Sequence, residues 1–342
     1  MAVKKVSRSS LDAWVDGLIA RGNVIGIQAK DDRFDFAPLK KAGDLRLDYD
    51  VSLTPPSRTV LQPPSEVLLT FKGVAYEPVM QHEPFVLLGV HPYDLVAIGQ
   101  MDIVLSKDNP DVHYLSRRQA ATIVACDVEN VSKNVFAGCV GTAWTDEGFD
   151  ILLTRIGDGY LADVRTDKGR VLMDDGLGGA PDASKRDLAA RQRVWRKNER
   201  RLRQHELKMD PAELPALLEK SYDHPVWAEK AKLCFSCGSC VTLCPTCYCF
   251  DVQEDVDWTL ESGRRVRKWD GCMLPGFAAV AGGHNFRKDK VDRFRHRYYR
   301  KGKYVAELVG RCACVGCGRC ITVCVSHVAQ PVEVFNRLLE AE

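Results

Sequence analysis

The sequence predicts a mixed α/β protein: an N-terminal α/β domain, a helical linker, and a smaller C-terminal module that carries a large insertion. Three observations lead to this prediction. Short apolar runs alternate with helix-like periodicity over the first half of the chain. A glycine-rich break and a long charged segment follow, and cysteines are then concentrated near the end. We expect the three parts to cover residues 1–178, 179–225 and 226–342.

The bulk composition describes a globular chain with no general attraction to polyanions. Its 342 residues suffice for two domains that each bury a core. An apolar content of 45% and a charged content of 27% are ordinary. The formal net charge is only +2, so we expect no nucleic acid or anionic membrane as partner unless a local patch provides one.

Fourteen cysteines are too many for inert use in a reducing cell, so they indicate either disulfides or metal ligation. The segment 1–8 has charges but no apolar run behind them, which predicts no signal peptide. No window approaches the roughly 20 apolar residues of a membrane span. We therefore expect a cytoplasmic protein whose thiols bind metal.

The first helix is expected to begin at a cap on Ser9 or Ser10 and to end at Gly22. Its apolar positions share one face, as in a helix that packs on a core: Leu11, Trp14, Val15, Leu18 and Ile19. Buried strands are expected at residues 67–69, 85–90, 121–125 and 149–153, with a helix over 94–104. No Gly-x-Gly-x-x-Gly or Walker loop accompanies them, so we expect no nucleotide site here.

The linker is predicted to start with the glycine-rich segment 176–181 and to continue as a charged helix over 185–208, capped by Ser184. Its many basic residues allow two interpretations, a nucleic-acid or partner surface and a solvated helix with internal ion pairs. Interspersed acidic residues favour the second interpretation. Trp195 is the one aromatic residue in this helix, which offers little for base stacking.

Two cysteine runs in the last third share the spacing C-x2-C-x2-C-x3-C, and a proline follows the first. Bacterial ferredoxins with two [4Fe–4S] clusters use this run, and the fourth cysteine of each run binds the other cluster. The C-terminal module is therefore predicted to be ferredoxin-like and to hold two such clusters. The ligands expected for the first cluster are Cys234, Cys237, Cys240 and Cys324, and those for the second are Cys314, Cys317, Cys320 and Cys244.

Two details qualify this motif. Val325 replaces the usual second proline, which removes no ligand. Gly238 and Gly318 are expected where the backbone approaches a cluster closely. Zinc is the alternative metal, but zinc sites favour two separated cysteine pairs around one tetrahedron, a different arrangement from these runs.

Six cysteines lie outside the two runs: Cys126, Cys139, Cys247, Cys249, Cys272 and Cys312. For Cys247, Cys249 and Cys272 a role as additional ligands and a role as buried unreactive thiols both stay open. Cys126 and Cys139 alone cannot hold a four-iron cluster, so buried thiols are the favoured interpretation for that pair.

The insertion between the runs covers residues 245–313 and contains a basic stretch, 287–303, with interleaved aromatic residues. Such a stretch can bind RNA, neutralise anionic clusters or face an acidic partner. We expect no nucleic-acid binding, because the stretch adjoins the predicted clusters. A closing helix is expected from Val332 to Leu339.

The chain resembles the A subunit of anaerobic sulfite reductase and the β subunit of cytosolic NiFe sulfhydrogenases. The segments that carry the resemblance are 237–249, 269–272, 281–287 and 314–320, with a weaker likeness at 92–95, at 148–150 and at Cys126 and Cys139. The resemblance implies an electron-transfer subunit of a hetero-oligomeric oxidoreductase complex. Its partners would be a flavoprotein subunit that oxidises NAD(P)H and a catalytic subunit of the hydrogenase or sulfite reductase type.

The resemblance also implies a departure in the N-terminal half. Members of this family tend to have cysteines at the positions of Tyr93 and Ala137, which with Cys126 and Cys139 could form a third cluster. Only Cys126 and Cys139 are present here, so this third site is expected to be lost or altered. His91 is the one conceivable substitute ligand.

Three functions are therefore compared. The favoured one is a relay subunit without a substrate site of its own, with its N-terminal domain attached to other subunits. A catalytic cluster with an open iron is disfavoured because all eight motif cysteines are present. A zinc-stabilised nucleic-acid-binding or scaffold protein is the remaining alternative.

Overall fold

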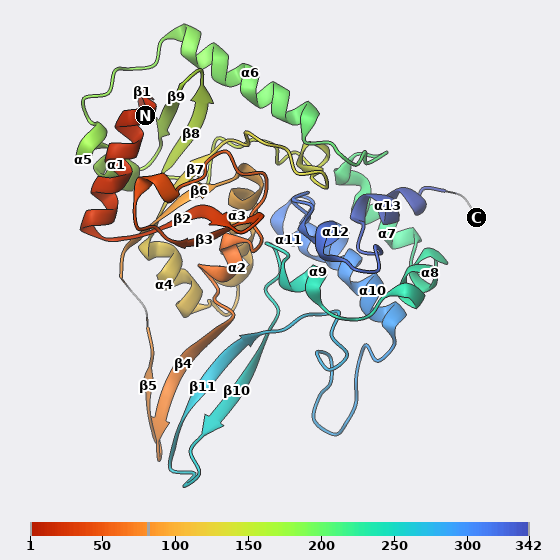
Figure 1. Cartoon of the computed structure of the whole chain (residues 1–342). Coiled ribbons are helices and arrows are strands. Elements are labelled where there is room, and N and C mark those ends of the chain that lie inside the picture. The colour runs from red at the N-terminus through yellow and green to blue at the C-terminus, as the bar shows by residue number, and fades with distance from the viewer. Residues whose placement is uncertain (1, 81–82, 341–342) are drawn as a thin grey trace.

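The computed structural model describes residues 2–80 and 83–340 (Figure 1). A seven-stranded sheet has the order β1-β9-β8-β7-β6-β2-β3. The strands β2, β6, β7 and β8 are parallel to their neighbours in that series, whereas β1, β3 and β9 are antiparallel additions at the edges. Their bounds are β1 Ala2–Val6, β2 Asn23–Lys30, β3 Arg33–Pro38, β6 Phe85–Val90, β7 Ala121–Cys126, β8 Ile151–Ile156 and β9 Gly159–Val164.

Helices cover both faces of this sheet, as expected for an α/β domain. On one face α1 (Arg8–Arg21) contacts α5 (Asp167–Leu177), and their apolar residues share a core with Leu88, Val124 and Leu153. On the other face α3 (Pro92–Ser106) and α4 (Val112–Ala120) pack on Leu87 and Ile123. The alternation of side chains along each strand supplies both cores.

Most predicted elements of this domain are confirmed, with shifted ends. The predicted helix 94–104 lies within α3, and the strands at 85–90 and 121–125 correspond to β6 and β7. The first helix ends at Gly22 as expected, but its cap is Ser7 rather than Ser9 or Ser10, because the Ser7 hydroxyl accepts a hydrogen bond from the amide of Ser10. The predicted strand 149–153 begins later, as β8.

Residues 67–69 form a strand as predicted, but the prediction that this strand is buried is wrong. This segment belongs to β4 (Ser65–Lys72), which lies in a separate four-stranded sheet of order β10-β11-β4-β5. Figure 1 shows this sheet projecting from the body of the molecule. Its other strands are β5 (Ala75–Pro78), β10 (Phe250–Val256) and β11 (Ser262–Trp269). Residues 67–69 are only half-buried, since no second layer covers the sheet there.

The charged helix of the linker is α6 (Lys185–Arg201), and it is shorter than the predicted 185–208. Its start is as predicted, because Ser184 and Asp187 form a reciprocal capping box. Leu202 is its C-cap, and the Leu202 carbonyl accepts a 2.9 Å hydrogen bond from the amide of Gly138, in the short helical segment Ala137–Cys139 of the N-terminal half. Trp195 is buried and stacks on Trp144, with 4.7 Å between the ring centroids.

The cysteine-rich region is built from short helices around one shared core. They are α7 (Leu214–Lys220), α8 (Val226–Leu233), α9 (Ser239–Thr242), α10 (Lys290–Tyr299), α11 (Val305–Val309), α12 (Arg319–Val323) and α13 (Pro331–Arg337). A π-helical turn over Arg300–Tyr304 joins α10 to α11. The predicted closing helix is α13, which buries Val332, Val334 and Phe335. Short helical segments elsewhere are α2 (Pro56–Thr59), Ala42–Asp44, Ala137–Cys139 and Pro211–Glu213.

Within the described residues, no helix has both the length and the apolar character that crossing a bilayer requires.

Candidate iron–sulfur centres

The two cysteine runs adopt the same local conformation. In each run a left-handed glycine, Gly238 at φ +76° and Gly318 at φ +78°, immediately precedes a short helix, α9 or α12. The two helices contact each other. This conformation favours glycine, because a side chain in the left-handed region is strained.

The surroundings of the two glycines add a second reason for their lack of a side chain. A Cβ on Gly318 would lie 2.4 Å from the carbonyl oxygen of Asn134, in the N-terminal half of the chain. A Cβ on Gly238 would lie 2.8 Å from the Leu274 side chain. Each glycine therefore permits close packing with a distant segment.

Two enclosed cavities are lined by cysteines from both runs. The first cavity is lined by Cys234, Cys237, Cys240 and Cys324. The second cavity is lined by Cys244, Cys314, Cys317 and Cys320. In each cavity, three cysteines of one run meet the last cysteine of the other.

Buried cations lie against these cavities and suit an anionic group. Arg297, on α10, lines both cavities, and its Nε and Nη1 atoms have no hydrogen-bond partner among the described residues. Burial by itself would lower the pKa of Arg297. The thiolates of Cys240 and Cys320 outweigh burial and raise this pKa well above its ordinary value. A group with negative charge in the cavities would supply the partner that these nitrogen atoms lack.

The second cavity has an additional cation. The Lys301 ammonium donates to the carbonyl and hydroxyl oxygens of Thr246 at 2.8 and 2.6 Å and lines this cavity. Burial opposes the ionised thiolate of Cys244, but Lys301 and Arg297 outweigh it and lower the pKa of this thiol. A lower pKa favours the thiolate, which is the form that binds metal.

Backbone amides also approach the sulfur atoms. The amides of Ser236 and Ala329 each donate to a thiol of the first cavity, at 3.4 Å to Cys234 and 3.4 Å to Cys324. Hydrogen bonds to ligand sulfur atoms are one of the means by which proteins set the potential of an iron–sulfur cluster. Eight thiols in two sets of four, two buried cations and donated amides together fit two four-iron clusters.

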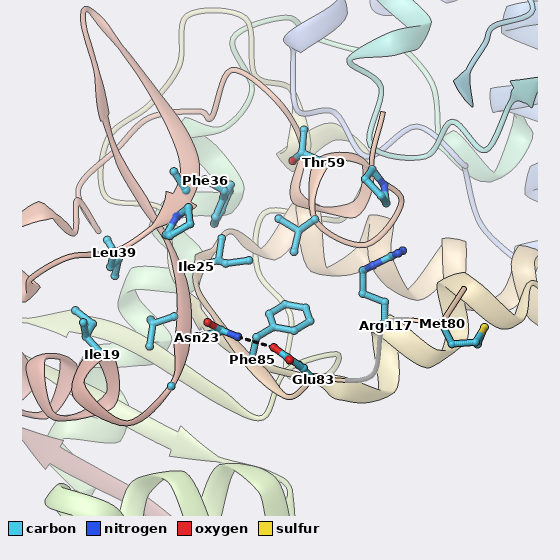
Figure 2. A pocket seen from close by; sticks show the side chains of 16 residues that line it. Ile19, Asn23, Ile25, Phe36, Leu39, Thr59, Met80, Glu83, Phe85 and Arg117 are labelled. Atoms are coloured by element: carbon cyan, nitrogen blue, oxygen red, sulfur yellow. Dashed lines mark hydrogen bonds between the residues drawn. The ribbon is translucent and has the colours of Figure 1, made fainter. Parts of the chain in front are cut away.

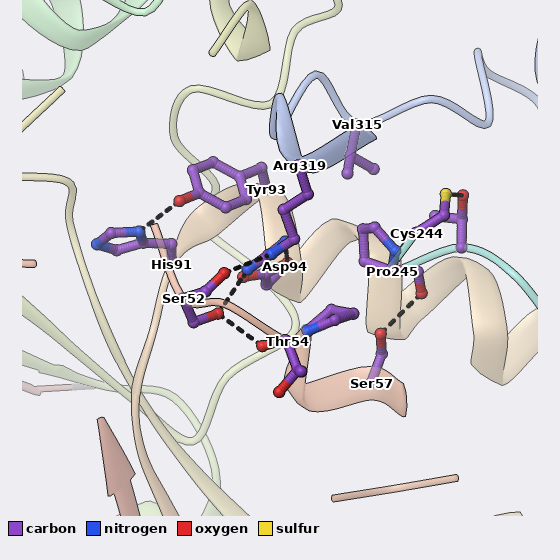
Figure 3. A network of polar contacts seen from close by, with 12 residues as sticks. Ser52, Thr54, Ser57, His91, Tyr93, Asp94, Cys244, Pro245, Val315 and Arg319 are labelled. Carbon is purple, nitrogen blue, oxygen red and sulfur yellow. Dashed lines mark hydrogen bonds and ion pairs between the residues drawn. The ribbon is translucent and has the colours of Figure 1, made fainter. Parts of the chain in front are cut away.

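A buried polar network joins the second cavity to the N-terminal domain (Figure 3). Arg319, in the second run, forms two 2.7 Å contacts with the carboxylate of Asp94 at the start of α3. It also donates to the carbonyl and hydroxyl oxygens of Ser52 at 2.9 and 2.6 Å. The Ser57 hydroxyl bonds to the carbonyl of Pro245 at 2.7 Å, directly after Cys244. The loops of the N-terminal domain therefore hold both segments that line this cavity.

Cys247, Cys249 and Cys272 lie together, outside both cavities. The Cys249 thiol is within hydrogen-bonding reach of Cys247 and of Cys272. Cys312 is separate, because its thiol bonds to the carbonyl of Lys301 at 3.8 Å.

Cys126 and Cys139 are not brought together. They belong to different core clusters, and their thiols approach the carbonyls of Leu47 and His205 respectively. Burial raises the pKa of both thiols, as expected for unreactive core cysteines. His91 is also occupied elsewhere: it stacks on Tyr49 at 3.8 Å, and its Nδ1 lies 2.7 Å from the hydroxyl of Tyr93.

Two further features bear on other functions. In the described residues, no three His, Cys, Asp or Glu side chains converge as ligands of a single metal ion. The N-terminal domain has a cleft of about 830 Å³ beside β2 and β6, lined mainly by apolar side chains and by no cysteine (Figure 2). Asn23 and Glu83, two of its few polar residues, bond to each other at 3.4 Å.

The sequence did not single out Arg319, Asp94 or Arg58 as functional. The basic stretch 287–303 gave the signal for Arg297 and Lys301, since neutralisation of the clusters was one of its interpretations. Nothing in the local sequence indicates that Asp94 pairs with Arg319, because the partners lie far apart in the chain.

Comparison with known proteins agrees with this site. Residues 233–328 match the family described as a 4Fe-4S dicluster domain. The protein is therefore a mixed α/β protein with a C-terminal 4Fe-4S dicluster domain, of the class that transfers electrons through iron–sulfur centres.

A curated relative is more specific. The chain is 32% identical over 319 residues to the beta subunit of sulfhydrogenase 2 from Pyrococcus furiosus, and the match covers 93% of each chain. The chain belongs to the family of sulfhydrogenase beta subunits.

Proposed function

We propose that the chain relays single electrons through two [4Fe–4S] clusters within a hetero-oligomeric complex. The observation that carries the proposal is the pair of cavities, each lined by four cysteines drawn from both runs. Cys234, Cys237, Cys240 and Cys324 would hold the first cluster, and Cys314, Cys317, Cys320 and Cys244 would hold the second. Bound clusters would supply reversible one-electron chemistry.

The protein's own residues would position and tune these centres. Arg297 would offset the negative charge of both clusters, and Lys301 would act on the second alone. The amides of Ser236 and Ala329 would donate to ligand sulfur atoms. With four thiols for each cluster, no open iron remains for a substrate, so the chain would be non-catalytic.

Membership of this family supports a proposal for the partners. The relative named above is a subunit of a sulfhydrogenase. We infer a cytoplasmic complex in which electrons pass between a flavoprotein subunit that oxidises NAD(P)H and a catalytic subunit of the NiFe hydrogenase or sulfite reductase type. The N-terminal domain would attach the relay to these subunits.

The zinc-stabilised nucleic-acid binder gains no support. Of the aromatic residues that would have to stack on bases, Phe294, Tyr298 and Tyr299 are at most 4% exposed. Phe286, immediately before the basic stretch, is 68% exposed, and a single exposed ring offers little for base stacking.

Iron and sulfide analysis with EPR of the dithionite-reduced full chain tests the proposal. About eight irons per chain and coupled signals of two reduced clusters are the expected result. Stoichiometric zinc without an EPR signal would rule the relay out. Turnover of NAD(P)H or sulfite by the isolated chain would contradict the non-catalytic role.

A further inference from the structure

Three cysteines meet at the base of the hairpin formed by β10 and β11. Cys249 directly precedes β10 and Cys247 lies shortly before it, whereas Cys272 follows β11 after Asp270 and Gly271. The base is closed by a 3.3 Å hydrogen bond from the Asp270 amide to the Cys249 carbonyl. A Cβ on Gly271 would lie 2.4 Å from Val241, so this glycine lets the Cys272 loop rest on α9 of the first cysteine run.

The thiols are mutual neighbours and are shielded from solvent. Cys249 is the central thiol, with Cys247 and Cys272 both within hydrogen-bonding reach of its sulfur. The exposed fractions are 5% for Cys247, 4% for Cys249 and 4% for Cys272. Contact between thiols is what formation of a disulfide requires.

Two guanidinium groups, one buried and one half-buried, lie beside the thiols. Arg300 places Nη1 3.0 Å from the Cys249 sulfur. Arg58 is fully buried, donates to the carbonyls of Cys247 and Cys249, and stacks on Trp269 at 4.5 Å. Its Nε and Nη2 atoms have no partner among the described residues. Burying the Arg58 guanidinium is costly unless negative charge lies beside it.

The ionisation of the thiols agrees with this arrangement. The hydrogen bond with Cys249 lowers the pKa of Cys272, and Arg300 acts in the same direction. The same kind of contact raises the pKa of Cys247 well above its ordinary value. The lowered pKa favours the thiolate of Cys272, and thiolates are the reactive form in disulfide chemistry.

We propose that Cys249 and Cys272 form a redox-active dithiol/disulfide couple next to the two cysteine cavities. This inference rests on the proposed relay function, which supplies one-electron acceptors in the same chain. The guanidinium groups of Arg300 and Arg58 set these thiols apart from inert core thiols. A metal centre is the alternative occupant of such a group, and iron and zinc analysis of Cys272→Ser separates the two outcomes.

The reaction balances with two one-electron acceptors. The sulfur atoms of Cys249 and Cys272 join in one S–S bond, the two S–H bonds of the dithiol break, and two protons and two electrons leave. Two bound clusters would supply the acceptors for these two electrons, one each. Reduction reverses every step. The couple would thus exchange electrons in pairs with centres that carry them singly.

A reductive titration of the full, cluster-loaded chain tests the proposal. Oxidised protein is titrated anaerobically with dithionite, and iron is measured on the same sample. The relay alone takes up about two electrons per chain, and the relay with the couple takes up about four. We expect about four for the unaltered chain and about two for Cys272→Ser and Cys272→Ala, with the iron content unchanged. Cys126→Ala, a matched loss of a buried thiol without a thiol neighbour, should remain at about four.

Peptide mass spectrometry after alkylation gives a second readout that does not depend on the clusters. In oxidised protein, Cys249 and Cys272 should be recovered as a linked peptide, and they should react with iodoacetamide only after reduction. Free thiols at both positions in the oxidised protein would overturn the proposal. So would iron or zinc beyond about eight atoms per chain that Cys272→Ser removes, since that result would mean a third metal site. A chain without clusters would refute the relay, whereas the linked peptide could still be sought in it with dithiothreitol as reductant.

Discussion

The first cavity lies close to solvent, whereas the second lies beneath the loops of the N-terminal domain. Cys237 of the first cavity is exposed, and its neighbours Phe235 and Val325 are 71% and 76% exposed. In the second cavity Cys317 and Cys320 are buried, and the adjacent Arg319 is only 3% exposed. The two runs have the same spacing and the same left-handed glycine, so this difference comes from distant residues that cover one cavity and not the other.

The comparison shows how one motif can provide two unlike redox centres. Solvent exposure, nearby charge and hydrogen bonds to sulfur set the potential of an iron–sulfur cluster. Lys301 and the Asp94–Arg319 pair belong to the second cavity alone. We therefore expect two centres of different potential and different accessibility, with the first as the centre that exchanges electrons at the surface.

The largest expected effect is a loss of stability on Asp94→Asn, which breaks the buried ion pair beside the second cavity. The change leaves the Arg319 guanidinium buried without its counter-charge, which should cost about 3–5 kcal/mol of stability. Thermal unfolding of the cluster-loaded protein measures it. The matched control is Glu229→Gln in the exposed pair with Arg337, where a loss of about 1 kcal/mol or less is expected. Equal effects of the two changes would show that the Asp94 pair does not hold the second run.

The next largest effect is the difference in stability loss between alanine substitutions at Gly318 and at Gly238. Gly318→Ala forces a Cβ against the backbone of Asn134, which cannot move aside, and should cost about 3 kcal/mol. Gly238→Ala has the same backbone strain but meets the flexible Leu274 side chain, so about 1–2 kcal/mol is expected. The melting temperatures of the two variants show which substitution costs more stability. A larger loss of stability for Gly238→Ala than for Gly318→Ala would mean that the close contact of Gly318 with Asn134 is not what makes Gly318 sensitive to substitution.

The sequence predicted local features well because they depend on near neighbours. The helix caps at Ser184 and Gly22 and the strands β6 and β7 follow from short-range hydrogen bonding and periodicity. The spacing of the cysteine runs likewise predicted which four thiols line each cavity. Whether they bind clusters in that way stays a prediction.

The sequence could not predict features that depend on long-range pairing. The register of β4 with β11 joins segments on opposite sides of the linker, and no local pattern encodes it. The same holds for Asp94 with Arg319, and for Arg58 beside Cys247 and Cys249. Periodicity also failed for residues 67–69, since an apolar run does not reveal whether a second layer covers it.

Removal of iron should distinguish the two cavities kinetically. An oxidant with a chelator should reach the first cavity sooner, because Cys237 on its wall is exposed, so a cluster there should be lost several times faster than one in the second cavity. The EPR signals of samples re-reduced with dithionite at intervals follow the loss. Simultaneous loss of both signals would contradict the difference in exposure.

The smallest effect concerns the cations. Arg297→Met removes a charge that both cavities share, and Lys301→Met removes one that lines the second alone. Less positive charge makes a cluster harder to reduce, so Arg297→Met should lower both potentials by about 50 mV and Lys301→Met should lower only one. Redox titration monitored by EPR measures both. A shift of both potentials by Lys301→Met would show that this lysine does not distinguish the cavities.

The central claim is that each cavity receives its fourth thiol from the other run, and Cys324→Ser tests it most directly. Redox titration with EPR is performed on the variant, and the two clusters are identified by their sensitivity to Lys301→Met. The account predicts that Cys324→Ser perturbs the cluster that Lys301→Met leaves unchanged, the one in the first cavity. Damage confined to the cluster that responds to Lys301→Met would contradict the crossed arrangement.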